Sequence, residues 1–441
     1  MTPPTKPEAP QALPPHMVPG RHWHALENGR IRCDLCPRAC DIPTGQRGLC
    51  FVRANVGGQM MLTTYGRSSG FCIDPVEKKP LNHFLPGTPI LSFGTAGCNL
   101  TCKFCQNWEI SKARKVETLN RDAAPDTIAQ AAQRTGCRSV AYTYNDPVIM
   151  LEYAMDTAKA CHAKGLRNVA VTAGYVEPAA RADFFSVMDA ANVDLKAFTE
   201  GFYKNLASAS LKPVLDTLKW LVHESNVWVE ITTLLIPTQN DADEELQALS
   251  AWVAEELTPE VPVHFSAFHP DHKMMDLPRT PHETLKRARA IAQAEGLRHV
   301  YLGNVHDKEA DATYCTGCGK AVIERDWYQL DAYHLTDSGA CKSCGTQMAG
   351  LFDGPVGDWG RKRVPIDPAR FASPAPQQVR LRSKQAVPQA KPKPAPAPVP
   401  PTQAPTSAAR PSMAPGAGQR VTARTVALPV QVPKHLLKKK S

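Results

Sequence analysis

Long apolar runs are absent from this sequence of 441 residues, and acidic residues are almost absent from one part of it. No run of about eighteen residues is apolar throughout, which excludes a conventional membrane-spanning helix. Residues 1–19 are rich in proline and lack the apolar core of a secretory signal peptide. We therefore expect no membrane segment and no secretion signal.

The shortage of acidic residues lies in residues 361–441, which contain 16 Lys and Arg but one acid, Asp367. This segment carries a net charge of +15, and since the whole chain carries +9, the first 360 residues carry −6. It also holds 16 of the 40 prolines and offers too little apolar surface to offset the entropy of folding. We predict a disordered basic tail over 361–441 and disorder over the proline-rich residues 1–18. A solvated linker is our preferred interpretation of the tail, with contacts to RNA or acidic proteins as the alternatives.

Cysteine is abundant, and many of the 14 cysteines lie in short C-x2-C and C-x3-C units. Such units are typical of metal sites in a reducing compartment rather than of disulfides, so we expect a cytoplasmic protein. Three pieces precede the tail. We predict a Cys-rich N-terminal lobe over residues 19–89, a central domain over 90–310 and a zinc-ribbon-like lobe over 311–350.

The central domain alternates short apolar runs with amphipathic stretches, which is typical of an α/β protein. The predicted strands are 90–94, 139–144, 168–172, 192–196, 227–235, 261–268 and 299–302. The predicted helices include 147–163, 178–190, 211–225, 241–256 and 281–295. This alternation implies a parallel sheet, and its length suits an open, partial (β/α)6 barrel better than a closed barrel of eight units. Functional sites in such folds lie at the carboxyl ends of the strands.

The most informative motif follows the first predicted strand directly. Cys98, Cys102 and Cys105 form a C-x3-C-x2-C triplet on one short loop. Three thiolates can hold three irons of a [4Fe–4S] cluster and leave the fourth iron open to another ligand. A cluster with an open iron can bind and reduce S-adenosylmethionine, which then splits into methionine and a 5′-deoxyadenosyl radical. A zinc knuckle and three buried thiols are the alternatives.

The triplet, with Phe104 before its last cysteine, resembles the signature of the radical S-adenosylmethionine (radical SAM) superfamily. That resemblance implies a radical SAM barrel, a [4Fe–4S] cluster and S-adenosylmethionine as cofactors, with Phe104 among the residues beside them. Residues 106–109, the Asp-Leu-Lys run at 194–196 and Pro237 are similar to those of pyruvate formate-lyase activating enzymes.

A narrower resemblance extends over residues 20–350. An upstream four-cysteine unit, the segments 74–80 and 142–147 and a terminal pair of C-x2-C units together resemble the AmmeMemoRadiSam-system radical enzyme. The name of that group implies a Memo-like protein as a partner. The reaction of the group does not follow from the resemblance.

The superfamily resemblance also implies cofactor contacts at the strand ends. In the superfamily a Gly-Gly-Glu-Pro run often grips the methionyl amino group, and here Asn145 and Asp146 precede Pro147 instead. Either side chain can accept a hydrogen bond from an ammonium group, and Asn or Asp before proline is also a common helix N-cap. Thr172, at the end of the next predicted strand, is expected to contact the methionine carboxylate or the ribose.

Two later strand ends carry further candidates. Asp194 and Lys196 project to the same side of their strand, because side chains alternate along a strand. We expect them to pair with each other and with the ribose and carboxylate of the cofactor; a purely structural ion pair is the alternative. His269 resembles a residue near the adenosyl group in pyruvate formate-lyase activating enzymes, and a solvated loop histidine is the alternative.

A four-cysteine group follows the central domain. Cys315, Cys318, Cys341 and Cys344 form two C-x2-C knuckles separated by 22 residues. This spacing is typical of a closed four-thiolate zinc ribbon, with rubredoxin-like iron as the main competitor.

A second four-cysteine group precedes the central domain and lies within 18 residues, at Cys33, Cys36, Cys40 and Cys50. Four thiolates at this spacing can bind zinc or a second, fully ligated iron–sulfur cluster. A cluster could relay electrons to the triplet, whereas zinc could only hold the lobe together.

These patterns lead to one functional hypothesis and one alternative. The hypothesis is a radical SAM enzyme that receives electrons from a flavodoxin or ferredoxin and abstracts hydrogen from a substrate across the barrel mouth, shielded in part by residues 77–81. The substrate could be a glycine in a partner protein, as in glycyl-radical activation, or another protein, an RNA or a small molecule. The alternative is a non-catalytic iron–sulfur and zinc scaffold or an electron carrier.

Overall fold

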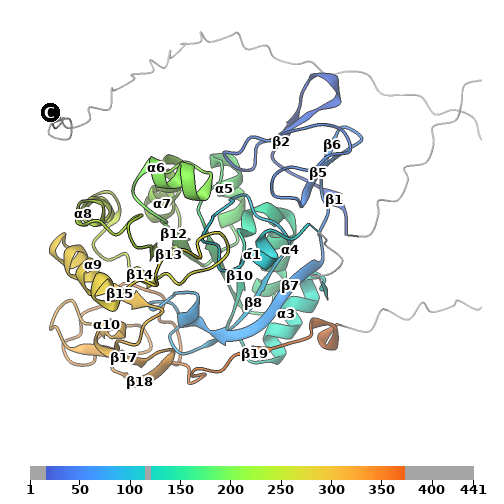
Figure 1. The fold of residues 1–441 in the computed structure, drawn as a ribbon. Helices are drawn as coiled ribbons and strands as arrows, with labels where there is room; N and C mark the ends of the chain where they lie inside the picture. The colour runs from blue at the N-terminus through green and yellow to red at the C-terminus, as the bar shows by residue number, and fades with distance from the viewer. Residues whose placement is uncertain (1–15, 115–120, 373–441) are drawn as a thin grey trace, which may run out of the picture. The chain divides into compact units, whose positions relative to one another are not determined.

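The computed structural model describes residues 16–114 and 121–372, and a mostly parallel sheet forms the centre of these residues (Figure 1). Seven of its described strands run parallel and lie side by side in chain order. They are β8 (Pro89–Gly94), β10 (Ser139–Tyr142), β11 (Arg167–Thr172), β12 (Ala190–Asp194), β13 (Trp228–Leu235), β14 (Val263–Ala267) and β15 (Val300–Gly303). The α/β fold with a partial barrel is therefore confirmed, and each predicted strand is present within a few residues.

Helices connect the successive parallel strands. The longer ones are α3 (Pro125–Arg134), α4 (Leu151–His162), α5 (Pro178–Phe185), α7 (Lys212–Glu224), α8 (Asp243–Trp252) and α9 (His282–Ala294). Shorter helices are α1 (Trp108–Ser111), η3 (Pro147–Met150), α6 (Glu200–Phe202), η4 (Tyr203–Ala207) and η5 (Val253–Leu257). Pro147 and Pro178 stand in the first turns of η3 and α5, where a missing N–H costs no hydrogen bond.

The N-terminal lobe consists of two small antiparallel sheets. One contains β2 (Trp23–Ala25), β3 (Ile31–Cys33) and β4 (Asp41–Ile42), with η1 (Glu27–Gly29) between the first two. The other contains β1 (Val18–Pro19), β5 (Arg53–Val56) and β6 (Gln59–Leu62). The predicted boundary at residue 89 is too late, because β7 (Arg67–Pro75) already pairs antiparallel with β8 and extends the central sheet.

Strand β7 also pairs with two short strands, β9 (Arg121–Asp122) and β19 (Val364–Pro365). Strand β19 and the following turn η6 (Pro368–Phe371) lie inside the range predicted as tail. That prediction began too early, because Ile366 donates its backbone N–H to Phe71 and Arg134 lies over the ring of Phe371. The rest of the predicted tail, 373–441, and residues 1–15 lie outside the described residues.

The C-terminal lobe is an antiparallel sheet that lies beside the edge strand β15 (Figure 1). It contains β16 (Thr313–Tyr314), β17 (Ala321–Asp326) and β18 (Gln329–Tyr333), preceded by α10 (Lys308–Asp311). It also contacts the segment 76–88, which begins with η2 (Val76–Lys78): Arg325 donates to the carbonyl of Asn82 at 2.8 Å, and the N–H of Leu85 donates to the carbonyl of Leu351 at 2.7 Å. No helix in the described ranges is long and apolar enough to cross a membrane.

Candidate active site and metal centres

A cavity of about 430 Å³ lies inside the partial barrel. One end is lined by the cysteine triplet and by residues from the ends of β10, β11 and β12. The predicted site residues that line it are Cys98, Cys102, Phe104, Cys105, Asn145, Asp146, Thr172, Asp194 and Lys196. The fold thus brings together most residues that the sequence analysis selected.

The triplet loop is fixed by Asn145. Its amide nitrogen donates to the carbonyls of Thr95, at 2.8 Å, and Gly97, while its oxygen accepts from the N–H of Thr95 at 3.3 Å. These hydrogen bonds occupy both ends of the amide. Asn145 is therefore placed to position the triplet loop rather than to grip a cofactor.

The triplet itself fits a cluster with three protein ligands. All three cysteines line one cavity. Within the described residues, only the C-terminal group has all its ligand atoms within 4.8 Å of one another; its members are Cys315, Cys318, Cys341 and Cys344. The triplet sulfurs are therefore spaced more widely than the ligands of a single metal ion. Burial raises the pKa of the Cys98 and Cys102 thiols. Thiolates therefore need compensating positive charge here, which iron and the nearby Lys196 would supply.

Asp146 both caps a helix and faces the cavity. Its carboxylate accepts from the N–H of Val148 at 3.1 Å, from the hydroxyl of Thr172 at 3.0 Å and from the N–H of Ala173 at 3.2 Å. Burial raises the pKa of Asp146 to about 6. The N-cap alternative is present, and the same carboxylate still lines the cavity beside Thr172.

The expected ion pair between Asp194 and Lys196 is present, with Nζ and Oδ2 2.8 Å apart. The backbone of Lys196 is held by the hydroxyl of Tyr203, and its ammonium lies 5.9 Å from the ring centre of Phe104. Burial alone would lower the pKa of Lys196, but the Asp194 carboxylate raises it. Lys196 therefore keeps its charged ammonium in this cavity, paired with the Asp194 carboxylate.

His269 is not brought into the cavity. Its side chain is exposed, and its Nδ1 lies 3.4 Å from the carbonyl oxygen of the neighbouring Pro270. Its position agrees with the solvated loop alternative.

The cavity also contains residues that the sequence analysis did not select as ligands. Within the described residues, Glu77 Oε2, Thr232 Oγ1 and Arg325 Nε are buried without a hydrogen-bond partner, and all three side chains line the cavity. Glu77 lies in the Asp-Pro-Val-Glu-Lys-Lys-Pro segment that the sequence analysis noted, whereas no local pattern marks Arg325, which comes from the C-terminal lobe.

A buried glutamate holds the segment 76–88, part of which lines the cavity. The Glu230 carboxylate accepts from the N–H groups of Asn82 and His83, at 2.9 and 2.8 Å, and lies 2.7 Å from the ring of His264. Burial alone would raise the pKa of Glu230, but these partners lower it. The ionised side chain of Glu230 thus fixes the backbone of the segment 76–88.

The C-terminal cysteine group has the dimensions of a single tetrahedral metal site. Its sulfur pairs are 3.5 Å apart for Cys315 and Cys344 and 3.9 Å apart for Cys318 and Cys341. Tetrahedral zinc with Zn–S bonds of about 2.3 Å separates its ligand sulfurs by about 3.8 Å. The four residues therefore fit zinc or a single iron.

The N-terminal cysteine group lines a second, smaller cavity. Its four thiols share this cavity with the apolar side chains of Leu35, Ile42, Leu49 and Ile149. Burial raises the pKa of Cys33 to about 11 and also raises the pKa of the Cys36 and Cys50 thiols.

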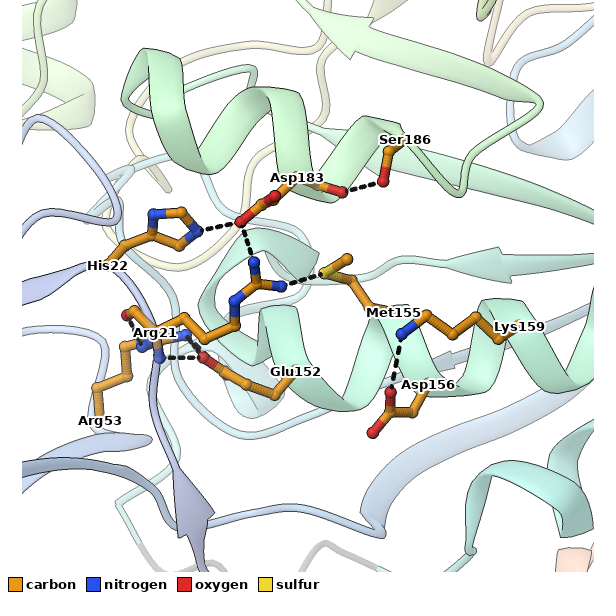
Figure 2. A network of polar contacts seen from close by, with 9 residues as sticks. All are labelled: Arg21, His22, Arg53, Glu152, Met155, Asp156, Lys159, Asp183 and Ser186. Atoms are coloured by element: carbon orange, nitrogen blue, oxygen red, sulfur yellow. Dashed lines mark hydrogen bonds and ion pairs between the residues drawn. The ribbon is translucent and has the colours of Figure 1, made fainter. Parts of the chain in front are cut away.

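Ion pairs fasten this lobe to the barrel helices (Figure 2). Arg53 is fully buried and donates to both carboxylate oxygens of Glu152 on α4, at 2.8 and 2.7 Å. Arg21 and His22 both contact the carboxylate of Asp183 on α5, at 2.5 and 2.7 Å (Figure 2). The lobe is therefore held in one position on the outside of α4 and α5.

Comparison with known proteins identifies the class of this chain. A family model of the radical SAM superfamily matches residues 93–249, which include the cysteine triplet. An uncharacterized protein of Methanocaldococcus jannaschii is 40% identical over 327 residues, which are 74% of this chain and 97% of that protein. Residues 93–249 therefore form a domain of the radical SAM superfamily, and the whole chain belongs to one family with this archaeal protein. Membership implies an enzyme that uses a [4Fe–4S] cluster and S-adenosylmethionine.

Two solved structures show more distant similarity. A domain of a pyruvate-formate lyase-activating enzyme from Bacteroides vulgatus is 16% identical, with a TM-score of 0.34, over 37% of this chain and 98% of that domain. A radical SAM methyltransferase from Sphaerobacter thermophilus is also 16% identical, with a TM-score of 0.39, over 65% of this chain and 76% of that protein. The family assignment rests on the sequence matches.

Proposed function

We propose that Cys98, Cys102 and Cys105 hold the catalytic cluster and that the residues facing them hold S-adenosylmethionine. When both are bound, reduction of the cofactor yields methionine and a 5′-deoxyadenosyl radical that abstracts hydrogen from a substrate. The observation that carries this proposal is the single cavity that the triplet shares with polar side chains from three neighbouring strand ends.

Each of these side chains has a distinct task in the proposal. Asp146 accepts a hydrogen bond from the methionyl ammonium. The hydroxyl of Thr172 keeps the Asp146 carboxylate in place. Lys196 binds the methionyl carboxylate, while Asp194 orients Lys196 and reaches the ribose. Phe104 offers an apolar surface of the cavity next to the Lys196 ammonium.

The substrate lies beside Glu77, Thr232 and Arg325 in this proposal. Buried polar atoms are normally hydrogen-bonded, so Glu77 Oε2, Thr232 Oγ1 and Arg325 Nε favour a polar ligand. Residues of the segment 76–88 and of the C-terminal lobe line this part of the cavity, among them Asn82, Trp327 and Tyr328. A glycine of a partner protein, the substrate in glycyl-radical activation, would have to reach these residues on an extended loop.

The proposal extends to the surroundings of the enzyme. We propose that it belongs to the AmmeMemoRadiSam-system group, works in the cytoplasm, receives electrons from a flavodoxin or ferredoxin and has a Memo-like partner. The many free thiols in metal-binding spacing support a reducing compartment.

Cleavage of S-adenosylmethionine tests the central claim. The anaerobically reconstituted protein with dithionite should produce 5′-deoxyadenosine, and Cys102→Ala should produce none. Cys137→Ala is the matched control, because Cys137 is also buried but does not line the cavity. A wild-type protein that contains iron and sulfide on the triplet yet forms no 5′-deoxyadenosine would favour the scaffold alternative.

A second measurement addresses the substrate. Arg325→Met and Glu77→Gln should leave cleavage of S-adenosylmethionine intact but uncouple it from substrate conversion in extracts that contain the substrate. A glycyl electron spin signal in a co-purified protein would identify a protein substrate, and a modified small molecule would identify the other class.

A further inference from the structure

We propose that Cys33, Cys36, Cys40 and Cys50 hold a second [4Fe–4S] cluster, not zinc, and that this cluster exchanges electrons with the one on the triplet. The electron exchange rests on the proposed function above, whereas the identity of the metal group does not.

The spacing of the sulfurs is the first observation. Within the described residues, the C-terminal cysteines are the one group of three or more potential ligands whose atoms all lie within 4.8 Å of one another. The four N-terminal thiols line one cavity but are more widely spread. A single zinc ion holds its sulfurs about 3.8 Å apart, whereas a [4Fe–4S] cube separates them further because each sulfur binds a different iron.

The chemistry of the cavity is the second observation. Beside the four thiols its walls are mainly aliphatic, from Leu35, Ile42, Leu49 and Ile149. No carboxylate or imidazole lines it within the described residues, so thiolates are the available anionic ligands. Two arginines also line it: the guanidinium of Arg53 is paired with Glu152, and Nη2 of Arg38 is buried without a hydrogen-bond partner in the described residues. Arg38 therefore offers positive charge suited to a cluster with four thiolate ligands.

The position of the cavity is the third observation. A Cβ atom on Gly97, next to Cys98 of the triplet, would overlap the carbonyl oxygen of Cys50. Arg38, between Cys36 and Cys40, donates to the carbonyl of Asn99 at 2.9 Å. The backbones of the two cysteine loops are therefore in direct contact.

The other side of the quartet is near the surface. Cys40 is half-buried and the adjacent Ala39 is exposed, whereas the remaining three cysteines are buried. A one-electron donor protein can approach at Cys40. One electron from this donor would reduce the N-terminal cluster. The N-terminal cluster would then pass the same electron to the catalytic cluster and be reoxidised. Neither transfer forms or breaks a bond or moves a proton.

The test uses the full chain, purified without oxygen, and a Cys36→Ser/Cys40→Ser double variant. We expect the variant to lose iron and sulfide equal to one cluster while its zinc content stays unchanged. It should still form 5′-deoxyadenosine with dithionite, but production should fall to background with a flavodoxin as the donor. Loss of zinc without loss of iron would overturn the proposal, as would unchanged production with flavodoxin.

A second variant tests the N-terminal cluster even if the double variant misfolds, because it leaves the four N-terminal cysteines unchanged. Cys102→Ala should retain one cluster, visible by Mössbauer and electron spin resonance spectroscopy, whose signal does not respond to S-adenosylmethionine. A Cys102→Ala protein without any cluster would also overturn the proposal. If both variants keep their expected iron but the wild-type protein forms no 5′-deoxyadenosine, the proposed function fails and the second cluster stands.

Discussion

The two four-cysteine groups of this protein use the same ligands in different surroundings. The C-terminal group is compact, and two of its members, Cys318 and Cys344, are exposed at the surface of a small sheet. The thiols of the N-terminal group are more widely spaced, and Asn99 and Ile149 of the barrel also line their cavity. The two groups thus differ in the spacing and surroundings of their thiols, not in the number of thiols.

The difference also separates an independent site from a composite one. The C-terminal group is built within one lobe, whose core contains Val322, Ile323 and Leu335. The N-terminal group needs the docked lobe and the barrel together.

Removal of one ligand from the compact site should have the largest effect. Structural zinc contributes about 10–16 kcal/mol in zinc-finger peptides, so Cys341→Ser should unfold the C-terminal lobe. Zinc analysis and hydrogen exchange of residues 313–333 measure the effect. Loss of iron instead of zinc from this variant would assign the compact site to rubredoxin-like iron.

Removal of Arg53, the buried cation beside the N-terminal cysteine group, should have the next largest effect. Arg53→Met leaves Glu152 buried without its partner and should destabilise the protein by about 3–5 kcal/mol in urea unfolding. The double variant Arg53→Met/Glu152→Leu should recover most of this loss, because no charge is then left unpaired. Arg32→Met is the control at an exposed pair with Asp41 and should hardly move the midpoint.

The contact between the two cysteine loops can be broken at Gly97. Gly97→Ala forces a side chain into a left-handed backbone (φ +84°) and against the carbonyl of Cys50. The control Gly45→Ala has a similar φ of +80° but open space around it. The control should cost about 1–2 kcal/mol, and Gly97→Ala should cost a further 1–3 kcal/mol or so.

The outcome for Gly97→Ala is read from thermal unfolding and from the magnetic interaction between the two clusters. Equal stability of the two glycine variants would show that the loops do not touch, and would weaken the case for electron exchange.

The smallest expected effect is a pH dependence at the wall shared by the cavity and the C-terminal lobe. Burial raises the pKa of Asp311 to about 7 from an ordinary value of 3.8, so the native state keeps a proton that the unfolded chain releases. This contribution to stability is complete below about pH 4 and is lost as the pH rises through 7. Between pH 5 and pH 8 it should change the free energy of unfolding by about 1 kcal/mol, because the half-buried side chain is partly solvated. Thermal unfolding of wild type and Asp311→Asn measures the difference, and identical pH profiles would contradict it.

Much of the fold could be predicted because its signals are local. Apolar runs mark the strands, and the prolines at 147 and 178 mark helix starts. The polar residues that follow the strands lie together, because parallel strands end at the same side of the sheet. The spacing of Cys315 to Cys344 likewise predicts a group that the fold gathers at single-ion distances.

The remaining features depend on contacts between distant parts of the chain. No local pattern reveals that Asn145 is occupied by the backbone of residues 95 and 97, or that Glu230 fixes residues 82 and 83. Strand β19 was missed for the same reason, since its partner β7 lies almost 300 residues earlier in the chain. His269 follows a strand as expected, but the loop after it turns the side chain toward solvent.

The wall formed by the C-terminal lobe has a consequence for biosynthesis. Arg325 reaches Asn82 across 243 positions, and His83 reaches Ala349 across 266. The ribosome therefore synthesises all seven parallel strands before it synthesises the C-terminal lobe that lines part of the cavity between them. Until then the cavity lacks the part of its lining that comes from this lobe, which includes Arg325, Trp327 and Tyr328.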